Sequence, residues 1–420
     1  MTANTQENSK KLTKLEKSWV LYDVGNSAFT MLVSTIFQIY FTSLTSAAGV
    51  DSTDSVAYWG YVMSAATLLV AVLGPILGTM ADGKGKKKPI FVGTIIVGVG
   101  GLLALTLAKS WIVFVAIFLA ARVGYSLSLI IYDAMLTDVT TDERMDTVSS
   151  YGYAWGYIGS CVPFILSLVL ILKADTFGLG TVTAMNIAFA INAAWWFGCT
   201  VPLLKEYKQI HYVENHESGG DSMKRLGQVF GELKQNKKAT TFLISFFFYI
   251  DGVYTIIDMA TVYGQSVGLG TTDLLLALLL TQFVAFPCAL LLNRLSSKYT
   301  PDKIIPVCII AYFGIAIFAL FLAHAWQFWM LATFVGVFQG AIQALSRSYF
   351  GKIIPKEKSG EYFGVYDIFG KGAAFLGTTL MGLATQIFNS SRAGVVIIAL
   401  MFLIGLIFFK KQEKIPVSNN

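Results

Sequence analysis

The fold is decided by one short charged turn, which reads Gly78-Thr79-Met80-Ala81-Asp82-Gly83-Lys84-Gly85-Lys86-Lys87-Lys88-Pro89 and joins two long apolar stretches. Gly78 allows a second helix to approach closely, Asp82 can cap or pair with a neighbouring helix, and Gly85 lets the chain reverse tightly. The lysines suit the anionic head groups of a membrane surface. The turn therefore predicts two spanning helices that meet where basic residues gather.

The composition of the whole chain agrees with a lipid environment. Hydrophobic residues make up 55% of the 420 residues and charged residues 13%, which is about half the charged share of a typical soluble domain. A soluble chain this apolar would have more apolar surface than one core can bury. The net charge of +6 requires no nucleic-acid partner, because membrane proteins gather Lys and Arg on one side.

Twelve stretches are apolar over about 20 residues, the length that a helix needs to cross a bilayer core about 30 Å thick. The expected spans are Ser18–Ser43, Val56–Met80, Ile90–Ala108, Trp111–Leu136, Ser149–Leu172, Thr181–Leu204, Thr240–Gly264, Asp273–Leu295, Lys303–Ala323, Gln327–Phe350, Glu361–Phe388 and Ala393–Lys410. They form two six-helix halves, residues 1–204 and 240–420. The prediction is an all-α membrane protein with twelve transmembrane helices.

The basic residues give the orientation of these spans. Of the 31 Lys and Arg residues, only Lys109, Lys173 and Arg392 fall in the loops of one side, and Arg122 and Lys371 lie inside spans. The others lie in the alternate loops, the tails and the helix ends beside them. The positive-inside rule therefore predicts that both termini are cytoplasmic. The segment before the first span lacks the pattern of a cleavable signal peptide, so we expect that span to be retained.

The hydrophilic segment at 205–239 is expected to be a cytoplasmic loop that contains an amphipathic helix. Its apolar residues recur at helical spacing and are Met223, Leu226, Val229, Phe230 and Leu233. This pattern is typical of a helix that lies on the inner leaflet. A disordered linker is the alternative interpretation.

Several motifs resemble one transporter family. The turn at 78–89 resembles the signature loop of the major facilitator superfamily, and a degraded counterpart occurs at 293–303, where Asn293, Ser297 and Thr300 replace glycine, aspartate and glycine. Further stretches, at 18–29, 152–159, 249–255, 343–350 and 361–367, are similar to the vacuole-effluxer-like branch. That branch includes the fungal autophagy-related vacuolar amino-acid effluxers and bacterial relatives. The resemblance implies two pseudo-symmetric six-helix halves and export of amino acids or similar solutes.

Ionisable and polar groups inside spans are costly and usually mark a pathway or a partner. We expect solute contacts from Asn26, Arg122, Asp251, Tyr254, Gln282 and Gln339. Asp251, Asp258 and Asp23 are the candidates for the coupling ion, since Asp251, Tyr254, Thr255 and Asp258 share one stripe of a helix. The alternative for each is a structural bond between helices, which for Arg122 is a pair with Asp133 or with an aspartate of another span.

Other residues are expected to act in gating. They are Gly78, Asp82, Gly85, Lys86, Arg347, Asp367 and Lys371. Asp367 and Lys371 are four residues apart and are therefore expected to pair within one helix. The alternative is that Lys371 changes its partner between states.

The predicted function is secondary active transport. We expect alternating access for a small polar or zwitterionic organic solute, such as an amino acid, with proton-coupled efflux. Proton- or sodium-coupled uptake and a lipid or amphiphile flippase are the alternatives. The sequence shows no nucleophile–base pair and no metal-ligand spacing, so we expect no enzyme activity, no cofactor and no metal. The expected state is a monomer in the inner membrane, in contact with lipid and without nucleic acid.

Overall fold

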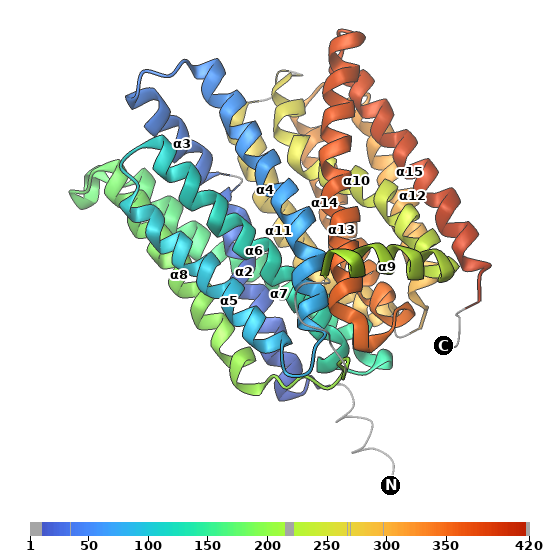
Figure 1. Cartoon of the computed structure of the whole chain (residues 1–420). Helices are drawn as coiled ribbons and strands as arrows, with labels where there is room; N and C mark the ends of the chain where they lie inside the picture. Colours follow the sequence, from blue (N-terminus) through green and yellow to red (C-terminus); the bar gives the residue numbers. More distant parts are fainter. Residues whose placement is uncertain are drawn as a thin grey trace.

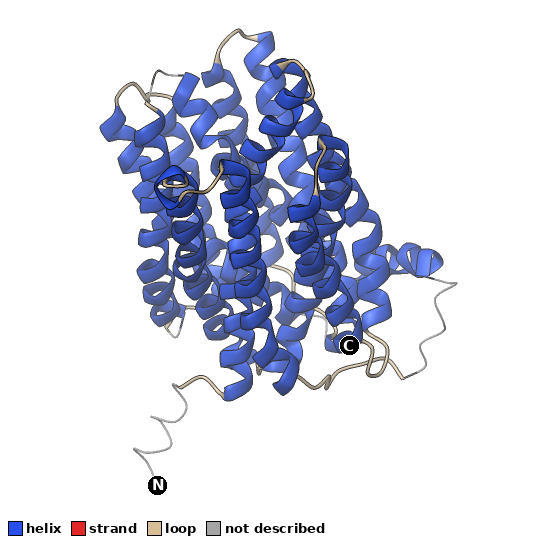
Figure 2. Cartoon of the chain, turned by 90° about the vertical axis from the view of Figure 1, so that its left-hand side faces the viewer, coloured by secondary structure: helices blue, strands red, loops and turns tan. Residues whose placement is uncertain are grey.

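The computed structural model describes residues 11–416, apart from Ser34, residues 215–221, Val267, Leu269 and Ser297. In this part of the chain every regular element is a helix, and the only bridge of strand type joins Gly83 and Val213. Most helices run in one general direction and form a single bundle (Figure 2). The expectation of an all-α protein is confirmed.

The helices follow the expected order along the chain. The first half contains α2 (Lys14–Val33), α3 (Ile36–Ala47), α4 (Ser52–Ala81), α5 (Lys87–Ala104), α6 (Trp111–Val139), α7 (Asp142–Leu172) and α8 (Thr181–Glu206). The second contains α10 (Lys237–Ser266), α11 (Thr271–Ser296), α12 (Pro301–Ala319), α13 (Ala325–Ile353), α14 (Ser359–Ile387) and α15 (Ser391–Glu413), and α9 (Ser222–Gln235) lies between the halves in sequence.

Ten segments of the described residues are long and apolar enough to cross a membrane. One of them, Lys14–Ala47, contains both α2 and α3, so the first expected span is interrupted between Val33 and Ile36. There the hydroxyl of Thr35 donates to the carbonyl of Met31, which competes with the helical backbone bonds. α11 offers the shorter apolar stretch Leu276–Leu291, and α14 packs against α4. The count of twelve stays a prediction that depends on α11 and α14.

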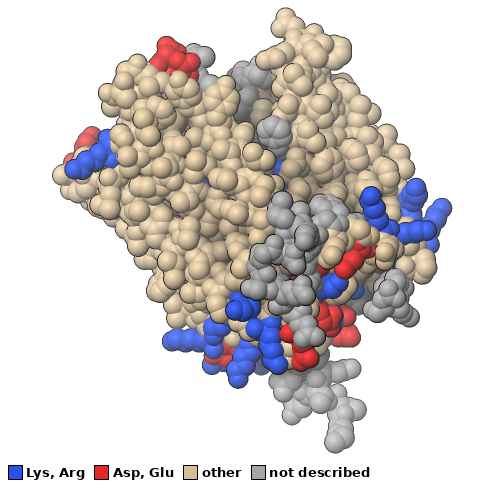
Figure 3. All heavy atoms as spheres, in the orientation of Figure 1, with Lys and Arg blue, Asp and Glu red and all other residues tan. Residues whose placement is uncertain are grey.

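Each half has its own hydrophobic core. One cluster is made of residues between Trp19 and Tyr207, and the other is made, except for Ala134, of residues between Val229 and Phe409. Between the halves, α4 packs on α14, and α7 packs on α11 and α13. Both chain ends lie toward the end of the bundle that carries the turn at 82–86, which we call the basal end (Figure 1). At the opposite, apical end the surface is hollowed between the two halves (Figure 3).

α9 occupies the segment for which an amphipathic helix was predicted, and the disordered linker is therefore wrong for residues 222–235. Val229 and Leu233 are buried, and α9 packs against α4 and α10. Glu232 pairs with Lys358 at 2.7 Å. The side chains of Met223, Leu226 and Phe230 lie outside the described residues.

Candidate functional site

The first polar contact between the halves is made by Asp82 at the basal end. Its Oδ1 accepts from the backbone N–H of Gly360 at 2.7 Å and its Oδ2 from that of Glu361 at 2.9 Å. These N–H groups belong to the first turn of α14, which has no side-chain cap of its own. A carboxylate is favoured at this position by the helix dipole. Asp82 therefore caps a helix of the other half.

The crossing of α4 and α14 brings two glycines together. A Cβ on Gly78 would overlap the carbonyl oxygen of Gly360, and a Cβ on Gly360 would overlap that of Gly78. Gly85 has φ of +69°, a conformation that side chains rarely adopt, and Lys86 is exposed. The predicted roles of Gly78 and Gly85 in close approach and tight reversal thus correspond to the local geometry.

Burial also affects the ionisation of Asp82. It raises the pKa of this carboxyl to about 7, because the loss of hydration outweighs the nearby Lys87 and the two backbone N–H donors. The carboxyl of Asp82 therefore titrates near neutral pH while it caps α14.

A short connector beyond α8 is fixed to the same turn. We call residues 207–213 the strap. Asp138 of α6 accepts from the hydroxyl of Tyr207 at 2.5 Å and from the backbone N–H of His211 at 2.8 Å. The N–H of Val213 donates to the carbonyl of Asp82 at 2.8 Å. The strap therefore belongs structurally to the N-terminal half.

Lys87 joins this network to the other half. Its ammonium group is fully buried, lies 3.0 Å from Asp138 and donates to the hydroxyl of Ser359 at 3.0 Å. Ser359 is the first residue of α14. A buried cation with both a carboxylate and a hydroxyl partner is well compensated, so this contact adds to the cap made by Asp82.

Further basal contacts join α7 with α13 and the residues after it. Asp146 pairs with Lys352 at 2.6 Å and accepts from the hydroxyl of Ser348 at 2.6 Å. Asp142 pairs with Lys356 at 2.9 Å. Together with the contacts of Asp82 and Lys87, these pairs close the basal end, and we call the set the basal gate.

Arg347 of α13 extends into the N-terminal half. Its Nη1 lies 3.0 Å from Asp133 and 3.6 Å from Asp23, and its Nε donates to the hydroxyl of Ser149 at 2.9 Å. Its guanidinium carbon also lies over three rings, at 4.7 Å from Trp19, 5.6 Å from Tyr132 and 4.3 Å from Tyr153. We call these six partners, Trp19, Asp23, Tyr132, Asp133, Ser149 and Tyr153, the Arg347 site.

A second group of charges lies where α6 faces α14. Asp367 and Lys371 pair at 2.7 Å, which confirms the predicted bond within one helix. Arg122 interacts electrostatically with both members of this pair, and Lys371 also with Asp133. Arg122 is half-buried and lies 5.5 Å from the ring of Tyr125. Asp133 is therefore the ion-pair partner of Arg347, rather than of Arg122.

Asp251 lies apart from these charges, between α10 and α14. It is fully buried, and its Oδ1 accepts from the hydroxyl of Thr255 at 3.2 Å and the backbone N–H of Gly377 at 3.1 Å. Its Oδ2 has no hydrogen bond, and no cation partners it, within the described residues. Tyr254, one turn along α10, is half-buried, and the side chain of Asp258 lies outside the described residues.

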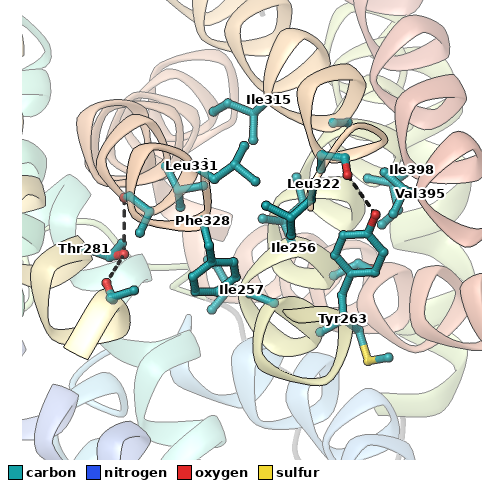
Figure 4. Close-up of a pocket in the computed structure, with 18 of the residues that line it drawn as sticks. Ile256, Ile257, Tyr263, Thr281, Ile315, Leu322, Phe328, Leu331, Val395 and Ile398 are labelled. Carbon is teal, nitrogen blue, oxygen red and sulfur yellow. Dashed lines mark hydrogen bonds between the residues drawn. The ribbon is translucent and has the colours of Figure 1, made fainter. Parts of the chain in front are cut away.

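Gln282 and Gln339 line an apolar cavity inside the C-terminal half (Figure 4). This cavity is bounded by α10, α11, α12, α13, α14 and α15. The hydroxyls of Tyr263 and Thr281 donate to backbone carbonyls, whereas Oε1 of the buried Gln339 accepts no hydrogen bond from the part of the chain that the structure describes.

The sequence interpretation missed part of this site. Asn26, for which a solute contact was expected, is buried, and its amide donates to Asp23 at 3.5 Å; the solute contact stays a prediction. The sequence interpretation assigned no role to Ser149, Lys87 or Asp138. A lysine run and a polar residue near a helix end are ordinary in membrane proteins, so their burial between helices gives no sequence signal. No group of three His, Cys, Asp or Glu residues suited to a metal occurs in the described part of the chain.

Comparison with known proteins adds a family to this geometry. A family model described as vacuole effluxer Atg22 like matches residues 12–413. A major facilitator-type transporter, YxiO, of Bacillus subtilis strain 168 is 39% identical over 97% of this chain and 98% of its own length. Autophagy-related protein 22-1 of Penicillium rubens is 24% identical, over 64% of this chain and 50% of that protein.

Solved structures show the same fold at low sequence identity. The FucP transporter in its outward conformation matches with a TM-score of 0.70 and 14% identity, over 96% of this chain and 98% of that one. A bacterial homologue of the iron transporter ferroportin in an outward-facing state has a TM-score of 0.68 and 12% identity, over 96% and 99%. These likenesses concern the fold alone.

Proposed function

Because the chain belongs to the Atg22-like vacuole effluxer family of major facilitator transporters, we propose that it moves a small polar or zwitterionic organic solute, such as an amino acid, by alternating access. The two moving units are residues 1–204 and 240–420, with the segment at 205–239 between them. The protein acts as a proton-coupled exporter in the bacterial inner membrane, with the basal end in the cytoplasm.

The observation that carries this proposal is the asymmetry between the two ends of the bundle. Polar contacts between the halves gather at the basal end, where Asp82 caps α14 and Arg347 reaches Asp133. The apical end is hollowed between the same halves (Figure 3). A protein closed at one end and open at the other is half of an alternating-access cycle, and the second state requires the basal gate to break.

The chemistry of the solute follows from the charges between α6 and α14. Arg122 and Lys371 bring a guanidinium and an ammonium group beside Asp367. Groups of these two kinds suit a carboxylate of the solute. The nearby carboxylate of Asp133 suits a positive group, so the two signs together favour a zwitterion over a neutral sugar or a simple anion.

The coupling proton is assigned to Asp251. A fully buried carboxyl without a cation partner is difficult to keep ionised in a low-dielectric environment. It can therefore hold a proton in the state described here and release it when the helices around it rearrange. Asp258 and Asp23 are the weaker candidates, since Asp23 already lies beside Arg347.

Flux in sealed liposomes tests this function. Purified protein is reconstituted, loaded with a mixture of labelled amino acids, and followed for release under an imposed pH gradient of either sign. We expect release to accelerate when protons flow against the solute, and exchange to occur without a gradient. Acceleration by a proton gradient in the same direction as the solute would indicate symport, and binding without any flux would exclude a transporter.

The Asp251→Asn variant tests the coupling site. The amide mimics the protonated carboxyl, so we expect gradient-driven release to be lost while gradient-free exchange continues. Asp273→Asn is the matched control, because Asp273 is an α11 carboxylate in the same half that accepts from Trp329 at 3.3 Å. If Asp251→Asn still responds to the pH gradient as the wild type does, Asp251 is structural and the proton uses another group.

A further inference from the structure

The Arg347 site is made entirely by the half to which Arg347 does not belong. The guanidinium is 3% exposed and is surrounded by two carboxylates, one hydroxyl, a backbone carbonyl and three aromatic rings. All of these groups come from α2, α6 and α7. Acidic groups combined with aromatic faces are the usual means by which proteins bind organic ammonium or guanidinium groups.

The walls of the site are held together without Arg347. Trp19 stacks on Tyr132 with ring centroids 4.2 Å apart, and its indole N–H donates to the carbonyl of Tyr132 at 3.0 Å. The amide of Asn26 lies 3.5 Å from Asp23 Oδ1. Because these bonds lie within one half, the site is preformed for a cation and needs little rearrangement to bind one.

Arg347 does not use every acceptor that the site presents. Oδ2 of Asp23 is buried and has no hydrogen bond within the described residues, since Nη1 of Arg347 stays 3.6 Å away. Asp133 keeps 21% of its side chain exposed and is therefore reachable by water. Arg347 thus compensates the charge of Asp23 at a distance that leaves Oδ2 open to a shorter hydrogen bond from another donor.

Opening of the basal gate must empty this site, because Arg347 moves with α13. The two carboxylate oxygens that share Nη1 lie no more than about 7 Å apart, so departure of the guanidinium leaves two neighbouring carboxylates without their cation. The open state therefore favours binding of a positive charge here. The three aromatic faces favour an organic cation over a bare proton or a metal ion.

We propose that, when the basal gate is open, the Arg347 site binds the alkylammonium or guanidinium group of the transported solute in place of Arg347. This rests on the proposed transport of a zwitterion and assigns its positive end. Solute and Arg347 then exclude each other, so the solute stabilises the open gate and its departure lets Arg347 return. Lys371, whose charge interacts with that of Asp133, is then available to the carboxylate of the solute.

Binding of small cations to purified full-length protein tests the proposal. The probes are butylguanidinium and butylammonium, with 1-butanol as the neutral control, and the readouts are thermal unfolding and calorimetric titration. Asp82→Ala is used as the background, because loss of the α14 cap favours the open gate. We expect both cations, but not 1-butanol, to raise the unfolding temperature in a saturable way.

Matched variants in that background decide the location. Asp133→Asn should weaken butylguanidinium binding at least about ten-fold, whereas Asp273→Asn should leave it unchanged, because Asp273 is a carboxylate of α11 that accepts from Trp329 and belongs neither to the basal gate nor to the Arg347 site. Tyr153→Leu keeps every charge and should weaken binding several-fold, which maintains the test if Asp133→Asn fails to fold.

Two results would overturn the assignment. One is equal affinity of the Asp133→Asn and Asp273→Asn proteins for butylguanidinium. The other is uptake of one proton on opening, measured by calorimetry in two buffers, that butylguanidinium does not displace; the site would then be a proton site. Flux in liposomes is measured separately, so a chain that transports but lacks this cation affinity contradicts only the assignment of the site.

Discussion

Arg347 is a single side chain on which closure of the basal gate depends. It is fully buried and bridges Asp133 and Asp23 across the boundary between the halves. Removing one partner of a buried ion pair leaves the other charges uncompensated, at a cost of about 3–5 kcal/mol. Loss of Arg347 therefore destabilises only the closed state, because in the open state Arg347 is already separated from these carboxylates.

Arg347→Ala should therefore shift the protein toward the open basal gate. The measurement is the rate at which a cysteine placed at Ser348, in a background without the four natural cysteines, reacts with an impermeant maleimide. We expect a rate increase of at least about ten-fold over wild type. Lys84→Ala is the control: its contact with Glu214 is exposed to solvent and should contribute no more than about 1 kcal/mol. Equal rates for the two variants would remove Arg347 from the gate.

Asp82 predicts a pH dependence of the same gate. Its pKa is raised to about 7 in the closed state, and it should return toward about 4 when the open gate hydrates it. Between these values the closed state binds more protons, so acidification favours closure and the effect ends above about pH 7. The difference in cysteine reactivity between wild type and Asp82→Asn should therefore follow the titration curve of a single group between about pH 5 and 7. A constant difference would mean that Asp82 does not titrate.

Only some of these residues could be predicted from the sequence. Asp82 and the pair of Asp367 and Lys371 follow from local spacing, because their geometry is set by one turn or one helix. The partners of Arg347 do not, since they depend on which faces of α6, α7 and α13 meet. Asp251 was identified as an intramembrane carboxylate, but its contact with the backbone of Gly377 depends on how α10 packs against α14.

Among the elements, the crossing of α4 and α14 allows the least change. Gly78 and Gly360 touch through their backbones, so any side chain at either position must separate the helices. Gly78→Val should cost about 1–3 kcal/mol through overpacking and should weaken the cap by Asp82. We therefore expect a lower unfolding temperature and a faster maleimide reaction of the cysteine placed at Ser348. Gly100→Val on α5 is the control, because a Cβ there meets open space.

The elements themselves were the most predictable part of the fold. Apolar length locates spanning helices whatever their neighbours are, and the spacing of Val229 and Leu233 was sufficient for α9. The break between α2 and α3 was missed, because a hydroxyl that bonds back to Met31 does not change the apolar pattern. The strap was missed because its bonds with Asp138 link residues about 70 positions apart.

For the molecule as a whole, the orientation remains a prediction from the basic residues. Lys86 is exposed in the turn at the basal end. A cysteine at this position should react with an impermeant reagent only in inside-out vesicles, because the positive-inside rule places this turn in the cytoplasm. A cysteine at Lys109 should show the opposite pattern. Labelling of Lys86→Cys in intact cells would reverse the orientation and, with it, the direction in which the basal gate opens.

The strap also limits how far the two halves can travel. Since Val213 is bonded to the backbone of Asp82, the covalent tether between the halves begins at Glu214 and not at the end of α8. Only eight residues, 214–221, then precede α9, and a fully extended chain of this length reaches about 30 Å. The length of the tether thus sets an upper limit on the separation of the two halves. Shortening it should restrict the state in which the basal ends of the halves are further apart, while cutting it should leave two fragments that still assemble.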